Sequence, residues 1–130
     1  MAMEKIKIEL VVEKGEGGLW GRVNYNDNLI SDFGTNLTDI DHKIKGLLKE
    51  FEDLDPNNVS FDYVYDMYAL FHEFDFLNIS KVAKHAGIHA GLLRQYSSGV
   101  KHPSFNQAKK IEDTIHRLAD EMKKATIFAE

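Results

Sequence analysis

The sequence predicts an α+β fold in which a small sheet domain precedes an all-helical domain. Three strand-like segments follow one another before residue 34, an amphipathic helix and a fourth strand-like segment come next, and the chain after residue 66 shows only helical periodicity. The order β-β-β-α-β favours a sheet with the helix packed on one of its faces. We therefore expect an α+β domain at residues 1–65 and a helical domain at residues 66–130.

Each of the first three strands is marked by its own pattern. Residues 5–12 alternate charged and apolar side chains and then become fully apolar, which indicates a strand with one buried face. Residues 14–18 contain three glycines and predict a turn, after which 19–25 read as a second strand. Asn and Asp tolerate positive φ, so residues 26–28 predict another turn before a third strand at 29–33. These segments predict a meander.

A helix and a fourth strand complete the expected sheet domain. The helix opens at Thr35 or Thr38, and its apolar side chains recur at steps of three and four residues. They are Ile40, Ile44, Leu47, Leu48 and Phe51. Residues 55–58 stop this helix, and 59–65 alternate at period two, as a strand does. Asp66 then caps a further helix.

Composition restricts the class of protein. The chain has 130 residues, 43% of them hydrophobic, with only two prolines, which is typical of a folded protein of one domain or two small ones. It contains no cysteine, so disulfides and thiolate metal sites are excluded. The N-terminal residues lack the apolar core of a signal peptide, and no apolar run approaches the roughly 20 residues that span a bilayer. We expect a cytoplasmic protein without a membrane partner.

Charge divides the chain unevenly. The net charge is -5, but residues 1–77 carry seven basic and sixteen acidic side chains (7 - 16 = -9), whereas residues 78–130 carry nine and five (9 - 5 = +4). Residues 78–110 contain six basic side chains and no acid. Such a stretch can bind phosphates within an acidic protein, or it can be a merely solvated pair of basic helices.

The basic stretch has the outline of a helix-turn-helix. Asn78 can cap a short helix, and Gly87 stands where a tight interhelical turn needs a left-handed residue. Residues 89–96 predict a second short helix, and Ser104 can cap a longer one. Short helix, glycine turn and short helix together are typical of DNA-binding proteins.

The expected contacts to DNA follow from residue type and position. His89, Ala90, Gly91, Arg94 and Gln95 occupy N-terminal and outward positions of the second helix. Small residues let the backbone approach a groove, and Arg and Gln pair bidentately with guanine and adenine edges. Phosphate contacts are expected from Ser97, Ser98, Lys101 and His102, with Lys81 from the first helix. Each feature taken singly also occurs on ordinary helices, so the prediction depends on their combination.

The segment NISKVAKHAGIHAGLLRQYSSGVKHPS, residues 78–104, resembles the helix-turn-helix of Cro-like (XRE) repressors. Ala83 and Gly87 match the small residues of the first helix and turn, Leu93 matches the buried position of the recognition helix, and SSGVKHPS matches the exit loop. The resemblance implies a DNA-binding unit in about a fifth of the chain.

The segment IKIELVVEKGEGGLWGRVNYNDNLISDFGTNLTDIDHKIKGLLKEF, residues 6–51, resembles the HicB type of antitoxin. That resemblance implies a partial ribonuclease-H-like domain that holds a small RNA-cleaving toxin, with a DNA-binding unit that represses the operon. The stretch VNYNDNLISDFG lacks the proline and cysteine of the family's P-x-L-P-G-C segment.

No residue pattern predicts catalysis, a cofactor or a metal site. Asp39 and Asp41 are two apart on a helix and therefore diverge, and Asp62 and Asp66 do not pair by spacing. His85 and His89 have a metal-binding spacing, but a glycine lies between them. The glycines at 15–18 lie in a hairpin, which is the wrong context for a phosphate loop. We expect a protein that is not an enzyme.

The sequence therefore predicts an antitoxin-like transcriptional repressor that binds double-stranded DNA and autoregulates its operon. A lone helix-turn-helix needs two half-sites for specific affinity, so a homodimer or a higher assembly is expected. The alternative is a protein-interaction module whose acidic N-terminal domain neutralises a small basic toxin or another partner, with a vestigial helix-turn-helix.

Overall fold

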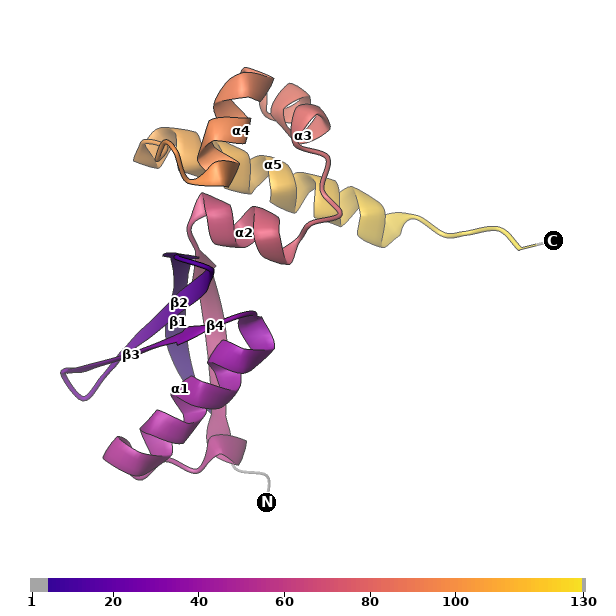
Figure 1. Cartoon of the computed structure of the whole chain (residues 1–130). Coiled ribbons are helices and arrows are strands. Elements are labelled where there is room, and N and C mark those ends of the chain that lie inside the picture. The colour runs from indigo at the N-terminus through magenta and orange to yellow at the C-terminus, as the bar shows by residue number, and fades with distance from the viewer. Residues whose placement is uncertain (1–4, 130) are drawn as a thin grey trace. The chain divides into compact units, whose positions relative to one another are not determined.

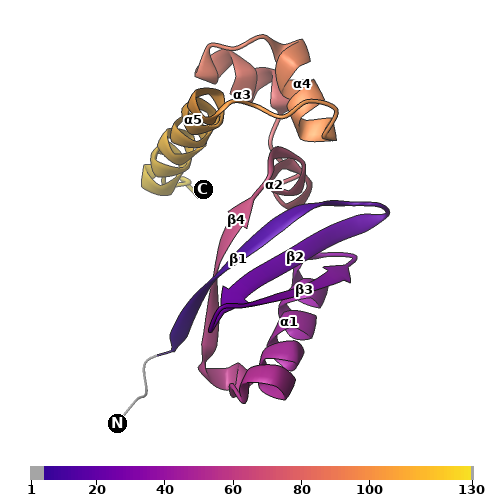
Figure 2. The ribbon, with the colours of Figure 1, turned by 90° about the vertical axis from the view of Figure 1, so that its left-hand side faces the viewer.

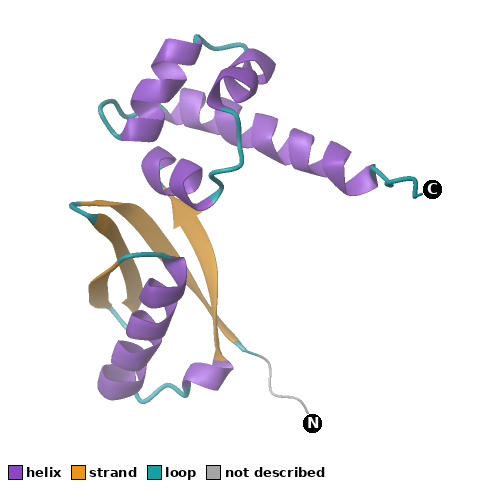
Figure 3. Cartoon of the chain, turned by 45° about the vertical axis from the view of Figure 1, so that its right-hand side comes forward, coloured by secondary structure: helices purple, strands orange, loops and turns teal. Residues whose placement is uncertain are grey.

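The computed structural model describes residues 5–129. The chain forms two compact units, Met1–Phe74 and Asp75–Glu130, which we call the sheet unit and the helical unit. Figure 1 follows the chain along its length, and Figure 3 distinguishes its strands from its helices. The described residues combine a four-stranded sheet with helices, which is compatible with the predicted α+β class.

The elements of the sheet unit follow the predicted order. They are β1 (Ile6–Gly15), β2 (Gly18–Tyr25), β3 (Asn28–Gly34), α1 (Leu37–Glu52), the 3-10 turn η1 (Pro56–Asn58), β4 (Val59–Tyr65) and α2 (Met67–Glu73). The meander of the first three strands is confirmed, since β1–β2 and β2–β3 are antiparallel. The chain then crosses through α1, so that β4 runs parallel to β1 and the strand order is β3-β2-β1-β4.

Helix α1 covers one face of the sheet, as Figure 2 shows. Ile40, Ile44 and Leu48 are fully buried on its inner side. Two glycines of the sheet let the helix approach closely, because a Cβ at Gly21 would lie 2.5 Å from Ile40 Cγ2 and one at Gly34 would lie 2.7 Å from Ile40 Cγ1. Buried strand residues complete this core: Ile8, Leu10, Val12, Leu19, Val23, Ile30, Val59 and Phe61.

The start of α1 corrects the prediction that Thr35 or Thr38 opens this helix. Asn36 is the N-cap, because its side-chain oxygen accepts a hydrogen bond from the Asp39 backbone N–H at 2.8 Å. The Asp39 carboxylate in turn accepts the Thr35 N–H at 3.1 Å. That backbone hydrogen bond, with the nearby charge of Lys43, lowers the pKa of Asp39. The acid thus stabilises the helix start.

The boundary between the units falls after Phe74 rather than after Tyr65, where the sequence placed it. Helix α2 belongs to the sheet unit, because its cap is tied to β1: the Asp66 N–H donates to Val12 O at 3.0 Å, and the Asp66 carboxylate accepts the Lys14 N–H at 2.9 Å. Ala69 of α2 is fully buried in the same core.

The helical unit contains α3 (Ile79–Ala86), α4 (Ala90–Ser98) and α5 (Phe105–Lys124). Its core draws on all three helices, from Val82, Ala83 and Ala86 through Leu93 and Tyr96 to Ile111. No helix among residues 5–129 is both long and apolar enough to cross a membrane.

Candidate nucleic-acid interface

Helix α3 has the caps that its sequence predicts. The Asn78 side-chain oxygen accepts the Lys81 N–H at 3.0 Å. At the other end Gly87 is left-handed (φ 70°), and the Ile88 N–H reaches back to Ala83 O at 3.0 Å. This turn ends α3 and lets α4 begin shortly afterwards, at Ala90. The predicted glycine turn is therefore present.

Small residues allow α3 and α4 to pack together. Ala83 is fully buried and Ala86 is nearly so, and Leu93 of α4 is fully buried. Helix α5, which contains the fully buried Ile111, packs against α3. Two α5 side chains also bind the end of α3, because Lys110 Nζ donates to Gly87 O at 3.5 Å and Arg117 donates to His85 O at 3.3 Å. The unit thus holds α4 on a packed support.

The outward side of α4 carries the predicted base-reading residues. Arg94 and Gln95 are exposed in the middle of the helix, while Gly91 lies one turn before them and Ser98 one turn after. Residues three and four apart share one helix face, so these four positions form a continuous stripe. We call Gly91, Arg94, Gln95 and Ser98 the recognition stripe.

His89 has a structural role that its predicted contact with DNA did not include. It is the N-cap of α4, and its Nδ1 accepts the Gly91 N–H at 3.2 Å. A Cβ added at Gly91 would lie 3.3 Å from this Nδ1, so the ring lies against the start of the stripe. Ala90 is partly buried beside it.

Arg94 is held by a residue that the sequence analysis missed. Its Nη2 donates to Ser80 Oγ, on the first turn of α3, at 2.7 Å. The hydrogen bond orients the guanidinium from the neighbouring helix and leaves its other N–H donors for a ligand. The pair spans 14 residues of sequence, and no local spacing rule points to it.

The two serines at the end of α4 are also engaged within the helix. Ser97 Oγ donates to Arg94 O at 3.0 Å, and Ser98 Oγ donates to Gln95 O at 3.1 Å. Their predicted phosphate contacts require these hydroxyl hydrogens to be redirected, although the oxygens still have lone pairs that can accept.

The basic side chains fall into two groups. Within residues 5–129, Lys81, Lys84 and Lys101 are exposed and form no ion pair. Lys109 pairs with Asp113 at 3.2 Å and Glu112 at 3.4 Å, and these partners raise its pKa. Its charge is therefore partly neutralised by acids that come just after the acid-free stretch. His102 is exposed beside Lys101 in the loop before α5.

Three of the four acids considered for catalysis, Asp39, Asp41 and Asp66, have structural partners. Asp41 accepts the Tyr63 hydroxyl at 2.9 Å and pairs with Lys45 at 3.1 Å, and Asp39 and Asp66 bind the helix starts described above. Burial, followed by the hydrogen bond to Asp41, raises the pKa of Tyr63. In the part of the chain that the structure describes, no three His, Asp or Glu side chains are grouped to hold a metal ion.

Comparison with protein-family models, with curated proteins and with solved structures gave no match for this chain. The assignment of a function therefore depends on the residues and geometry given above.

Proposed function

We propose that this chain is a cytoplasmic, sequence-specific DNA-binding protein that acts as an antitoxin-like transcriptional repressor of its own operon. One observation carries the proposal: Arg94, Gln95 and Ser98 of the recognition stripe are exposed and polar. Exposed lysines that form no ion pair within residues 5–129 accompany them, on α3 and in the loop before α5. A helix with these side chains fits a major groove, whose edges it reads while basic residues contact phosphates.

Arg94 and Gln95 divide the reading of bases between them. Arg pairs bidentately with guanine and Gln with adenine, and each good pair contributes about 1–3 kcal/mol of discrimination. The hydrogen bond from Arg94 to Ser80 fixes the guanidinium before DNA arrives, which reduces the side-chain entropy lost on binding. Gly91 has no side chain, so the start of the helix can approach the base edges closely.

The proposal includes a homodimer or a higher assembly. A single recognition helix makes few contacts, and specific helix-turn-helix proteins bind two half-sites about 34–36 Å apart. The operator is then expected to be an inverted repeat, since two-fold protein symmetry is matched by two-fold DNA symmetry.

A mobility-shift assay tests the proposal directly. The DNA upstream of the chain's own gene is the probe, at two salt concentrations, with the variants Arg94→Ala and Gln95→Ala. We expect specific retention that weakens with salt, and a loss of about 5- to 150-fold in affinity in each variant. Arg22→Ala is the matched control, because it removes an exposed arginine from the sheet unit. Absence of any shift at low salt would contradict the proposal.

A second candidate function has its own support. Residues 1–74 carry seven basic and fifteen acidic side chains (7 - 15 = -8), so the sheet unit would attract a small basic protein such as a toxin. Co-purification with the product of an adjacent small basic reading frame, unaffected by Arg94→Ala, would support this function. An antitoxin that also represses its operon would perform both.

A further inference from the structure

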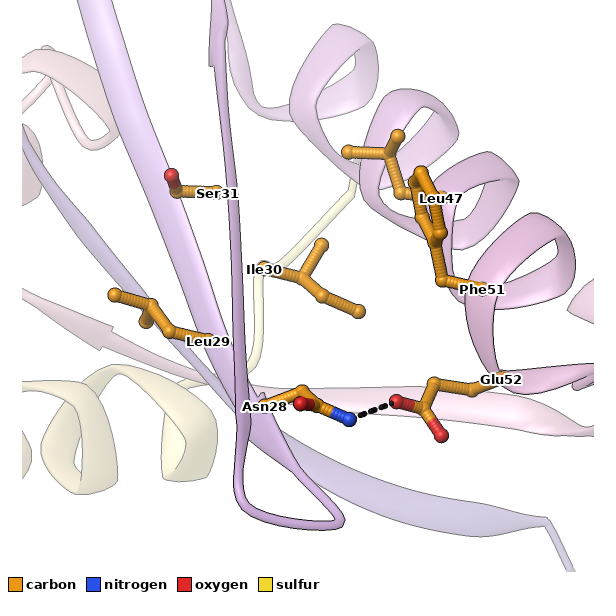
Figure 4. A pocket seen from close by; sticks show the side chains of 7 residues that line it. All are labelled: Asn28, Leu29, Ile30, Ser31, Leu47, Phe51 and Glu52. Carbon is orange, nitrogen blue, oxygen red and sulfur yellow. Dashed lines mark hydrogen bonds between the residues drawn. The ribbon is translucent and has the colours of Figure 1, made fainter.

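A groove lined by apolar and polar residues runs between β3 and the second half of α1. Ile30 points into the groove from β3, Leu47 and Phe51 line it from the helix, and Asn28 and Glu52 lie at one end. The side chain of Leu29 points to the other side of β3, as Figure 4 shows. Its volume is about 510 Å³. Leu29 is 63% exposed and Phe51 is 66% exposed. Phe51 is thus a large apolar side chain exposed beside a hollow, and Leu29 is one exposed on the other side of the same strand. An extended segment added at this edge could cover both.

The strand beside this groove, β3, has backbone hydrogen-bonding groups that are open to a further strand along part of its length. β3 is an edge of the sheet and pairs only with β2 among the described residues. The two-residue turn makes Tyr25 and Asn28 the first hydrogen-bonded pair of the ladder, so alternation directs the backbone groups of Leu29, Ser31 and Phe33 outward.

The two ends of this edge differ. The backbone groups of Phe33 already have hydrogen-bond partners, because its N–H donates to Asp32 Oδ1 at 2.8 Å and its carbonyl accepts a hydrogen bond from Lys43 Nζ at 2.9 Å. Leu29 and Ser31, next to the groove, have no such side-chain cap within residues 5–129. A short strand can therefore pair at this end only, by the backbone pairing used in peptide recognition at sheet edges.

The chain contains a segment with matching chemistry at its C-terminus. Residues 125–129 follow α5 without secondary structure, and the backbone of Ala125 is extended. Ile127 is 93% exposed and Phe128 is 85% exposed. Thr, Ile and Phe at 126–128 have high strand propensity. In a strand, Ile127 and Phe128 point to opposite faces, so one enters the groove while the other lies beside Leu29.

Charge matches as well. Lys123 and Lys124 precede the segment, whereas Glu52 lines the groove and Asp27 and Asp53 lie in the turns at its end. Glu52 accepts hydrogen bonds from the side chains of Asn26 and Asn28, which hold its carboxylate at this position.

We propose that residues 125–129 of a second copy bind this groove as a short strand added to β3. The choice of a second copy rests on the proposed function, because reading two half-sites requires two chains. The exchange is reciprocal, so two copies close into a symmetric dimer. The partner is thus an extended apolar segment that follows two lysines.

Peptide binding tests the groove without DNA. The probe is a fluorescent peptide of residues 121–129, added to the chain truncated after Lys124, whose fold is checked by circular dichroism. We expect saturable binding that Phe51→Ser weakens about tenfold, since it removes an apolar side chain that the bound segment would cover. The control is Trp20→Ser, on the opposite face of the sheet, which leaves binding unchanged. A peptide with aspartate at 127 and 128 does not bind. Absence of binding to the truncated chain overturns the proposal.

Light scattering of the full chain tests the second copy. We expect a dimer that truncation after Lys124, or Phe51→Ser, shifts toward monomer. A monomeric full chain whose peptide still binds the truncated form overturns the exchange between copies and assigns the groove to the chain's own terminus. Neither assay contains DNA, so the two proposals can fail independently. If the mobility-shift assay shows no DNA binding, peptide binding and dimer formation can still be observed. If the peptide does not bind, the mobility-shift assay still tests DNA recognition.

Discussion

The left-handed backbone of Gly87 ends α3 and starts the turn that leads into α4. Its φ is 70°, and a Cβ at this position would meet only Lys110 Nζ, 3.9 Å away. Space is therefore available, but an L-residue in this conformation costs about 1–2 kcal/mol. We predict that Gly87→Ala lowers the free energy of unfolding by about 1 kcal/mol in urea denaturation.

Gly46 is the matched control for that prediction. It lies in the middle of α1, and a Cβ added there would have no neighbouring atom within 4 Å, while its backbone is helical. Gly46→Ala should raise the free energy of unfolding by about 0.5–1 kcal/mol, because alanine loses less backbone entropy on folding. If both substitutions shifted stability in the same direction, the conformational explanation for Gly87 would be wrong.

Sequence reasoning at this scale identifies residue types better than their partners. The exposure of Arg94 and Gln95 follows from helical periodicity, since Leu93 and Tyr96 occupy the buried side. The hydrogen bond from Arg94 to Ser80 could not be predicted, because it depends on the angle between two helices. The position of His89 at the start of the second helix predicts a contact with DNA, whereas in the structure its ring caps α4. Whether a side chain binds its own helix or a ligand depends on its rotamer, which the spacing of residues along the sequence does not specify.

At the scale of elements, the order of strands and helices could be predicted, but strand pairing could not. β1 pairs with β2 through a tight turn, which sequence proximity favours. Its other neighbour is β4, much further along the chain, with Leu10 opposite Tyr63. The apolar run in the middle of β1 is buried, since Leu10 and Val12 have no exposed surface. The crossover through α1 decides which strand pairs with the second edge of β1, and no local sequence pattern predicts that pairing.

The place of α2 gives a prediction about fragments. Ala69 is fully buried in the core of the sheet unit, and the ring of Phe74 lies 5.9 Å from that of Tyr65. A fragment ending at residue 74 should therefore unfold cooperatively in urea, whereas one ending at residue 65 exposes this core and loses several kcal/mol at about 25 cal/mol per Å² of apolar surface.

Chemical denaturation followed by tryptophan fluorescence checks both fragments, because Trp20 lies in the part they share. Equal stability of the two fragments would place α2 outside the sheet unit and restore the boundary that the sequence alone indicated.

For the whole molecule, charge separates the two units. The sheet unit carries -8, and the helical unit carries nine basic and six acidic side chains (9 - 6 = +3). The total of -5 conceals this division, so overall charge is a poor guide to the ligand of either unit. An acidic unit repels phosphates and a basic unit attracts them, so under the proposed function DNA is expected to bind the helical unit only.

The salt dependence of DNA binding should therefore depend on particular lysines of the helical unit. Each phosphate contact adds about 0.9 to the slope of log affinity against log salt. Lys81→Ala and Lys101→Ala should each reduce that slope by about 0.9 without changing which sequence is preferred, because the proposed function assigns these lysines to phosphates and not to bases.

Lys109→Ala is the internal control, since its ammonium is already paired with Glu112 and Asp113. In the Lys109→Ala variant the slope of log affinity against log salt should change much less, although the same formal charge is removed. Fluorescence anisotropy on one duplex across a salt series measures all three variants. An equal reduction for Lys81, Lys101 and Lys109 would mean that DNA responds to the net charge of the unit, and the assignment of contacts around the recognition stripe would then be wrong.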